Sequence, residues 1–295
     1  MLIRPLTLLN LFVAIVMLSI GLRVSTGELI NVVRNRGLVT RALLANCVLI
    51  PALGFLLVHL FPLAPAARIG ILLLAAIPGT PIALQFTRQA KTRLAFAAAM
   101  TFVLSVVSVA MTPLALRVIP ETARQNERPV LLLVANIVLY IALPLICGVW
   151  ATHHLPKITH HMVLPLGLVA SALFILLMQE TRLVRAEAYA AIRGGGAVIA
   201  MFLLLLFSML IGWLIGGPDR DSHRVLATTT GMRSVIVVLY VARYCFPGTN
   251  VYAVPIAYAS LMVPTNLIFH LACTVWNKVR PASVSAGPGR LSPGT

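Results

Sequence analysis

Charged residues are scarce in this chain, and their scarcity excludes a water-soluble fold. Asp, Glu, Lys and Arg together make up 10% of the residues, whereas a soluble globular domain carries about 25%. Lipid must therefore supply most of the solvent. Only helices and closed β-barrels satisfy every backbone amide inside a bilayer. The alternating segments of a barrel are lacking and long apolar runs such as 13–18 are present, so we expect an all-α polytopic membrane protein.

Acidic residues are rarer still: seven Asp and Glu stand against 23 Lys and Arg, which gives a net charge of +16. Proteins that bind nucleic acids gather such charge on one soluble face. Here Lys and Arg lie mainly in short gaps between apolar runs, where cytoplasmic loops collect them. The expected surroundings are the lipid bilayer. Nucleic acid is excluded as a partner, and no protein partner is evident.

The signatures of metal sites and membrane enzymes are also lacking. The four cysteines lie inside apolar segments and form no CxxC pair, which indicates neither a zinc site nor a disulfide framework. An intramembrane metalloprotease needs an HExxH-like pair, and an aspartyl protease needs two membrane aspartates. The chain has neither, because its acidic residues lie in loops or at span ends. We expect no enzymatic activity, no metal and no other cofactor.

Apolar runs long enough to cross a membrane occupy most of the chain. Each crossing needs about 20 apolar residues, and no hydrophilic region is long enough for a second domain. The sequence therefore predicts one transmembrane transporter domain over 1–280 and a disordered, Gly-, Pro- and Ser-rich tail over 281–295. The predicted spans are 7–24, 39–61, 66–88, 93–118, 129–151, 162–179, 194–216, 224–246 and 251–277.

The distribution of Lys and Arg predicts how the bundle is oriented. Loops after odd-numbered spans, together with the tail, carry 13 of these residues, and the opposite side carries nine. Because cytoplasmic loops hold the excess of basic residues, we expect the C-terminus in the cytoplasm. The expected location is the cell (inner) membrane.

Two of the predicted spans are interrupted. The third contains Pro78-Gly79-Thr80-Pro81, and a helix cannot continue smoothly through two such prolines. The eighth contains the polar segment 228–234, which must line a cavity or pack on protein rather than face lipid. Interrupted spans in corresponding places of two halves are typical of a transporter's midplane binding site. The sequence thus predicts inverted halves whose broken helices cross.

Arg233 is the most unusual residue of this predicted site. An arginine at mid-span costs at least about 2.5 kcal/mol, so it must face a partner or a cavity. Three alternatives stay open: it pairs with Glu180 or with free carbonyls at the helix break, it is a fixed cation that binds an anion, or the span is mispositioned. The neighbouring hydroxyls either bind the same anion or bond back to helix carbonyls. The candidate substrate-binding residues are Gly79, Thr80, Thr228, Thr229, Thr230, Gly231, Arg233 and Ser234.

Several motifs lie in order along the chain: Met17 to Leu22 is similar to M-x-x-G-L, Ala76 to Thr80 to C-P-G-G-T, Leu143 to Gly148 to a P-x-x-x-G helix, and Gly231-Met232 with Ala253 to Pro255 to a second broken helix. The spacing to Thr101 and to Thr112-Pro113 fits the helix between them. With these motifs the chain resembles the bile acid/sodium symporter family. The resemblance implies two inverted repeats, a core domain with two crossing broken helices, a flatter panel domain and about nine spans.

The positions that the family uses for sodium depart from its pattern. The resemblance implies sodium ligands from a Ser-Asn pair and a Glu-x-G-x-Gln-Asn stretch; Ala83, Leu84, Thr229, Gly231, Arg233 and Ser234 stand there instead. A hard cation needs several oxygen ligands, and of the usual polar ligands only Thr101 is left, so it joins the candidate site. The resemblance therefore implies a secondary transporter of a small organic anion, whereas these departures argue against sodium coupling. A channel and a non-transporting membrane sensor that keeps the fold are the alternatives.

Overall fold

The computed structural model describes residues 3–24, 26–79, 94–118, 135–180, 196–217 and 220–279, and these residues form helices and no β-strand. The predicted all-α fold is confirmed. The predicted tail, 281–295, lies outside the described residues. The helices in chain order are α1 (Ile3–Gly21), α2 (Thr26–Arg34), α3 (Arg36–Leu44), η1 (Ala45–Leu49), α4 (Ile50–Leu60), α5 (Pro65–Ala76), α7 (Leu94–Val118), η3 (Val138–Ala142), α9 (Leu143–His154), α10 (Pro156–Glu180), α12 (Ala197–Leu214), α13 (Arg220–Gly231), α14 (Val235–Cys245), η4 (Asn250–Tyr252) and α15 (Ala253–Val279).

Except for α2, which lies between the first two predicted spans, the described helices fall on the predicted spans. By length and composition, six stretches within the described residues can cross a membrane. Two shorter apolar helices, Thr7–Gly21 and Pro65–Ala76, accompany them. The six stretches are Arg36–Leu60, Ala99–Arg117, Ala135–His154, Ala197–Leu214, Ser222–Cys245 and Asn250–Trp276.

Two spans contain a π-helical turn just before a proline. The turn η1 ends two residues before Pro51, and η3 ends two residues before Pro144. Proline has no N–H and its ring crowds the preceding turn, so a wider turn relieves the helix at this point. Turns of this kind are frequent at functional sites. Here, η1 places Asn46 inside the protein, where its side chain is fully buried.

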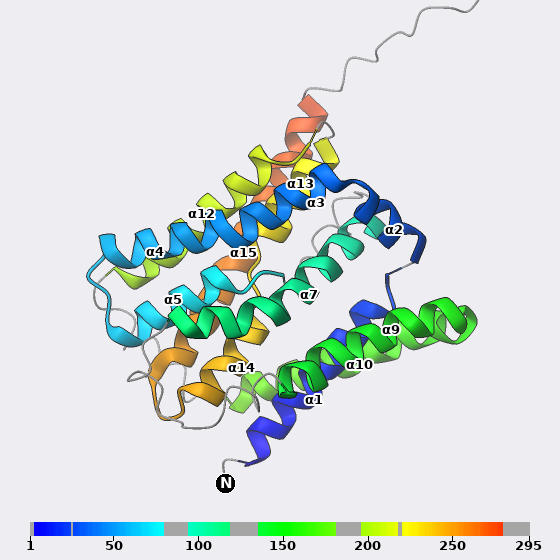
Figure 1. The fold of residues 1–295 in the computed structure, drawn as a ribbon, viewed down its shortest axis with the longest axis horizontal. Coiled ribbons are helices and arrows are strands. Elements are labelled where there is room, and N and C mark those ends of the chain that lie inside the picture. The colour runs from blue at the N-terminus through cyan, green and yellow to red at the C-terminus, as the bar shows by residue number, and fades with distance from the viewer. Residues whose placement is uncertain are drawn as a thin grey trace, which may run out of the picture.

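The helices form two groups, as the resemblance implies. Figure 1 shows α1, α9 and α10 side by side, apart from the larger group that contains the remaining spans. Within the smaller group, α1 and α9 approach closely where Gly21 meets Gly148. We call this group the panel and the larger group the core.

The core is built from two halves that run in opposite directions. The start of α12 packs at the end of α4, where Gly196 meets Phe61, and the chain after α12 returns to the start of α3, where Gly217 meets Leu38. The span α3–η1–α4 is therefore antiparallel to α12. Since α5 follows α4 and α13 follows α12, these two helices enter the membrane from opposite faces. Opposite entry of this kind is what inverted halves require, and the repeat itself stays a prediction.

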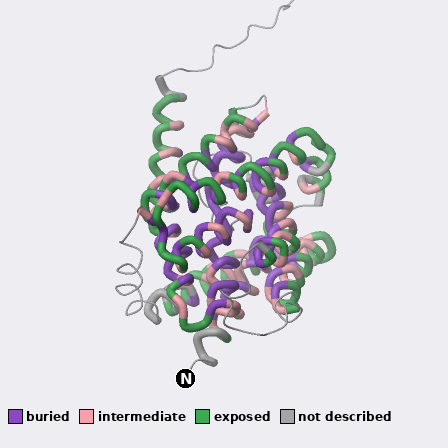
Figure 2. The backbone as a smooth tube through the Cα atoms, turned by 60° about the vertical axis from the view of Figure 1, so that its left-hand side comes forward, coloured by how far each residue is buried: buried purple, intermediate pink, exposed green. Residues whose placement is uncertain are grey.

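The polarity of the bundle is suited to lipid. In Figure 2 the exposed residues lie on the outward faces of the helices and the buried residues between them. Large apolar side chains are among the most exposed: Leu164 is 72% exposed, Leu214 70% and Ile268 67%. Several polar side chains are buried instead, among them Asn46, Thr112, Ser208 and Arg233. Outward-facing apolar side chains of this size are suited to contact with lipid tails rather than with water.

The contact between α1 and α9 gives a stability prediction. A Cβ atom at Gly148 would lie 2.6 Å from the Leu18 carbonyl oxygen and 2.8 Å from the Gly21 Cα. Because backbone cannot move aside easily, we expect Gly148→Ala to lower the melting temperature of the purified protein by roughly 3–10 °C. Gly167→Ala is the matched control, since Gly167 has only an ordinary 3.7 Å contact with the Arg23 side chain. An equal effect of the two substitutions would contradict the packing.

Candidate functional site

The first break follows from Pro78. The Leu74 carbonyl lies four residues before Pro78, which has no N–H to offer it, and α5 ends at Ala76. Ile77 is extended, and Gly79 has a φ of +80°, a left-handed conformation that glycine adopts without strain. The predicted interruption is confirmed. It leaves the last carbonyls of α5 without partners from their own helix.

The second break is narrower than the polar segment 228–234 suggested. Thr228, Thr229 and Thr230 are helical and form the last turn of α13, which ends at Gly231. The non-helical residues are 232–234, and α14 begins at Val235. The interruption itself is confirmed.

Gly231, the last residue of α13, lies in a crowded position. A Cβ atom there would lie 2.2 Å from Cγ of Met209 on α12. Its carbonyl accepts a 2.7 Å hydrogen bond from the Tyr258 hydroxyl on α15. The end of α13 is therefore held from two neighbouring helices.

Arg233 joins the two breaks. Its side chain is fully buried, its Nε donates to the Leu74 carbonyl at 2.8 Å, and its Nη2 donates to the Ala75 carbonyl. The backbone N–H of Ser234 also donates to the Ile77 carbonyl at 3.4 Å. Helix C-termini carry partial negative charge, so the guanidinium caps α5. Of the open alternatives for Arg233, pairing with carbonyls at the helix break is confirmed. Anion binding stays a prediction.

Asn46 completes the contacts of Arg233, and the sequence analysis missed it. Its Oδ1 accepts a 2.7 Å hydrogen bond from Nη1 of Arg233. Its Nδ2 donates to the Ala42 carbonyl at 2.9 Å and to the Thr230 hydroxyl at 3.3 Å. The available signal was an asparagine inside the apolar run 42–50, since polar residues inside a membrane are costly and usually functional. The sequence alone does not tell that this span packs against the breaks.

The predicted threonines divide into different environments. Thr228 and Thr229 donate to the carbonyls of Arg224 and Val225, each at 2.8 Å, so back-bonding is confirmed for these two. The Thr228 hydroxyl also lies 3.0 Å from Nε2 of His270. Thr80 lies outside the described residues.

Two predicted hydroxyls are buried without a hydrogen-bond partner among the described residues: Oγ1 of Thr101 and Oγ of Ser234. Ser234 precedes α14 directly. Thr101 lies on α7, one turn before Ser105, whose backbone N would lie 3.1 Å from a Cβ atom at Gly79. Buried polar atoms are rarely left without a partner, so these hydroxyls favour a ligand beside the breaks. Arg233 can also donate to such a ligand. Three of its five N–H donors are used in the bonds described above, and two remain.

The comparisons with known proteins agree with this architecture. The sequence profile described as Sodium Bile acid symporter family matches residues 10–184, more than half of the chain. The chain is also 26% identical, over 250 residues or 82% of its length, to the "Probable sodium/metabolite cotransporter BASS2, chloroplastic" of Oryza sativa subsp. japonica. The matched region covers 57% of that relative, so the chain spans little more than half its length. Because the profile matches over that length, the chain belongs to the sodium bile acid symporter family.

Proposed function

We propose that this protein is a secondary transporter, not an enzyme, and that it carries a small organic anion without sodium. Membership in a symporter family supports the transporter class, and the rice relative is described as a sodium/metabolite cotransporter. The observation that carries the proposal is the bonding of Arg233 across the two breaks.

Arg233 takes the ligands that a coupling cation would need. In transporters with broken helices, carbonyls at unwound segments and at half-helix C-termini coordinate sodium. Here the carbonyls of Leu74 and Ala75 and the Oδ1 of Asn46 accept hydrogen bonds from the guanidinium. The positively charged guanidinium of Arg233 thus occupies the oxygens that would otherwise coordinate sodium. These residues do not fit a sodium site.

The same charge favours an anionic substrate. Arginine binds carboxylates through charge-assisted and often bidentate hydrogen bonds. The hydroxyls of Ser234 and Thr101 are buried donors. The N-terminus of α14, directly after Ser234, adds the partial positive charge of a helix start. A dry environment strengthens each of these interactions.

Burial of the site favours a carrier over a channel. Thr101, Arg233 and Ser234 are each at most 1% exposed, so the substrate can reach them only after helices move apart. Movement of the core against the panel would open the site to one face at a time, the usual mode of transporters with inverted repeats.

Reconstitution into proteoliposomes tests this function. We expect slow, saturable uptake of one member of a panel of labelled carboxylates and sulfonates, with exchange when the same anion is loaded inside. Fast, non-saturating flux would identify a channel instead. Absence of flux for an anion that stabilises the purified protein would identify a sensor.

We also propose that the C-terminus faces the cytoplasm, in the cell (inner) membrane. The start of α3, the start of α13 and the end of α15 lie on one face of the bundle, because Gly217 meets Leu38 and Arg224 donates to the Cys273 carbonyl. These helix ends carry Arg36, Arg220 and Lys278. Reporter fusions after Thr26 and after Lys278 should both report a cytoplasmic location. An exterior signal from either fusion would overturn this orientation.

A further inference from the structure

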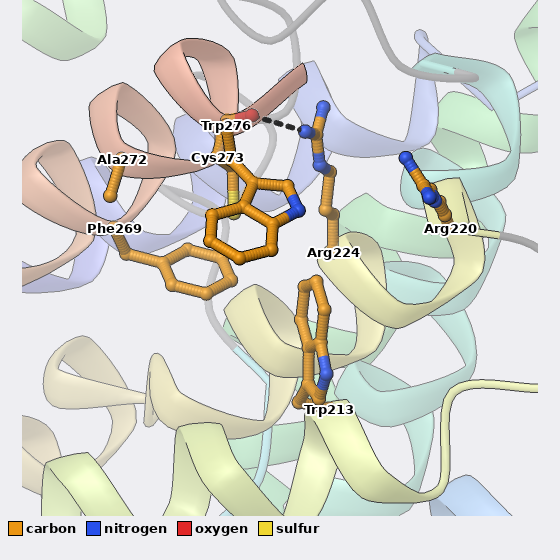
Figure 3. Close-up of a pocket in the computed structure, with 7 residues that line it drawn as sticks. All are labelled: Trp213, Arg220, Arg224, Phe269, Ala272, Cys273 and Trp276. Atoms are coloured by element: carbon orange, nitrogen blue, oxygen red, sulfur yellow. Dashed lines mark hydrogen bonds between the residues drawn. The ribbon is translucent and has the colours of Figure 1, made fainter. Parts of the chain in front are cut away.

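A pocket separate from the breaks lies where two spans end and a third begins. Its volume is about 360 Å³. It is formed by the end of α12, the first turns of α13 and the last turns of α15 (Figure 3). The residues that line it are Trp213, Arg220, Arg224, Phe269, Ala272, Cys273 and Trp276.

The pocket lies near the ends of its three helices, where a span would meet the membrane surface. Tryptophan is enriched where a bilayer meets water, and both indole rings of the pocket, Trp213 and Trp276, lie within a few residues of a span end. The apolar residues next to them are strongly exposed: Leu214 is 70% exposed, Val275 60% and Leu271 57%. Exposed apolar residues of this kind on α12 and α15 are suited to contact with lipid.

Two arginines supply the charge of the pocket. Arg220 and Arg224 are four residues apart on α13, so they lie on the same face of the helix, where like charges repel each other. Figure 3 shows the guanidinium groups of both arginines on one side of the Phe269 and Trp276 rings, to the right in this view. Nη2 of Arg224 donates to the Cys273 carbonyl at 2.7 Å, which fixes this guanidinium at the pocket. Among the described residues that line the pocket, the charged ones are these two arginines.

We propose that this pocket binds an anionic phospholipid. The phosphate lies against Arg220 and Arg224 and relieves the repulsion between them, while the upper part of an acyl chain packs on Phe269 and Trp276. Basic pockets between transmembrane helices bind anionic headgroups in this way. The site goes beyond the proposed transport of a free anion, because it faces lipid and involves neither break.

The lipid would also hold α13 to α15 near the transport site. One turn inward from the Arg224 contact with Cys273, the Thr228 hydroxyl of α13 meets Nε2 of His270 on α15. A lipid bound at the outer contact therefore stabilises the same helix pair.

Thermal unfolding of the full-length protein with added phospholipid tests the site. We expect phosphatidylglycerol to raise the melting temperature of the wild type more than phosphatidylcholine does. The concentration of phosphatidylglycerol needed for half of this shift should rise about fivefold in Arg220→Gln. It should also rise in Trp276→Ala, because the acyl contact is lost. Lys157→Gln is the matched control: it removes one exposed positive charge on the same face of the bundle, at the start of α10 in the panel.

Three results would overturn the proposal. Equal stabilisation by the two lipids would show that the headgroup charge is not recognised. An equal loss in Lys157→Gln and Arg220→Gln would show general attraction to a charged surface. Stabilisation by a free aromatic carboxylate that exceeds that by phosphatidylglycerol and is lost in Arg220→Gln would identify a substrate vestibule instead. None of these outcomes depends on whether transport needs sodium.

Discussion

Arg233→Gln should reduce the uptake of the organic anion by roughly 100-fold, because removing one partner of a buried, hydrogen-bonded charge pair costs about 2–5 kcal/mol. Glutamine cannot replace the charge, and it leaves at least one of the carbonyls of Leu74 and Ala75 without a donor. Arg233→Lys should recover only part of the uptake, since an ammonium is a point charge and lacks the planar fork of arginine.

The fold must be monitored beside transport in these variants. We expect Arg233→Gln to lower the melting temperature as well, so uptake should be expressed per folded protein. Arg243→Gln is the matched control: Arg243 belongs to the same span, but its guanidinium lies over the Tyr252 ring, 4.7 Å from the centroid, outside the crossing. Equal loss of uptake in Arg243→Gln and Arg233→Gln would contradict a specific role for Arg233.

Asn46→Asp should separate the charge of the site from its architecture. Aspartate has the shape of asparagine and can still accept the hydrogen bond from Nη1 of Arg233, now as a salt bridge. Because this carboxylate neutralises the guanidinium, we expect anion uptake to fall by at least about tenfold, as is typical when a like charge opposes a ligand. The melting temperature should stay close to that of the wild type, because the new ion pair offsets the lost donation from Nδ2 to the Ala42 carbonyl.

Asn46→Leu is the companion variant. It removes the acceptor of a buried, charge-assisted hydrogen bond and should cost about 1.5–3 kcal/mol of stability, visible as a lower melting temperature. Uptake in Asn46→Asp that equals that of the wild type, with the fold intact, would show that the charge of Arg233 plays no part in recognising the substrate.

The sequence predicted the spans and both breaks because the signals for them are local. Long apolar runs predict spans by composition alone, and Pro78 ends a helix by its own geometry, whatever surrounds it. The opposite directions of α4 and α12 follow from the even number of predicted spans between them, 66–88, 93–118, 129–151 and 162–179.

The contacts of the site could not be predicted in the same way. Asn46 and Arg233 are 187 residues apart in the chain, and no local pattern tells which spans meet at the breaks. Thr228 and Thr229 were predicted as site hydroxyls, but their own helix offers carbonyls four residues earlier. Whether a threonine bonds back or faces a ligand depends on the rotamer, which packing decides. The sequence identified Arg233 correctly as the unusual residue and left its partner open.

Uptake by proteoliposomes with sodium replaced by choline tests the central claim most directly. We expect the wild type to take up its anion at the same rate in both media, because the guanidinium of Arg233 holds the three oxygens that a coupling cation would bind. Under the same conditions, Arg233→Gln should lose uptake in both media. Uptake that requires sodium and survives in Arg233→Gln would contradict the account and restore a sodium-coupled mechanism.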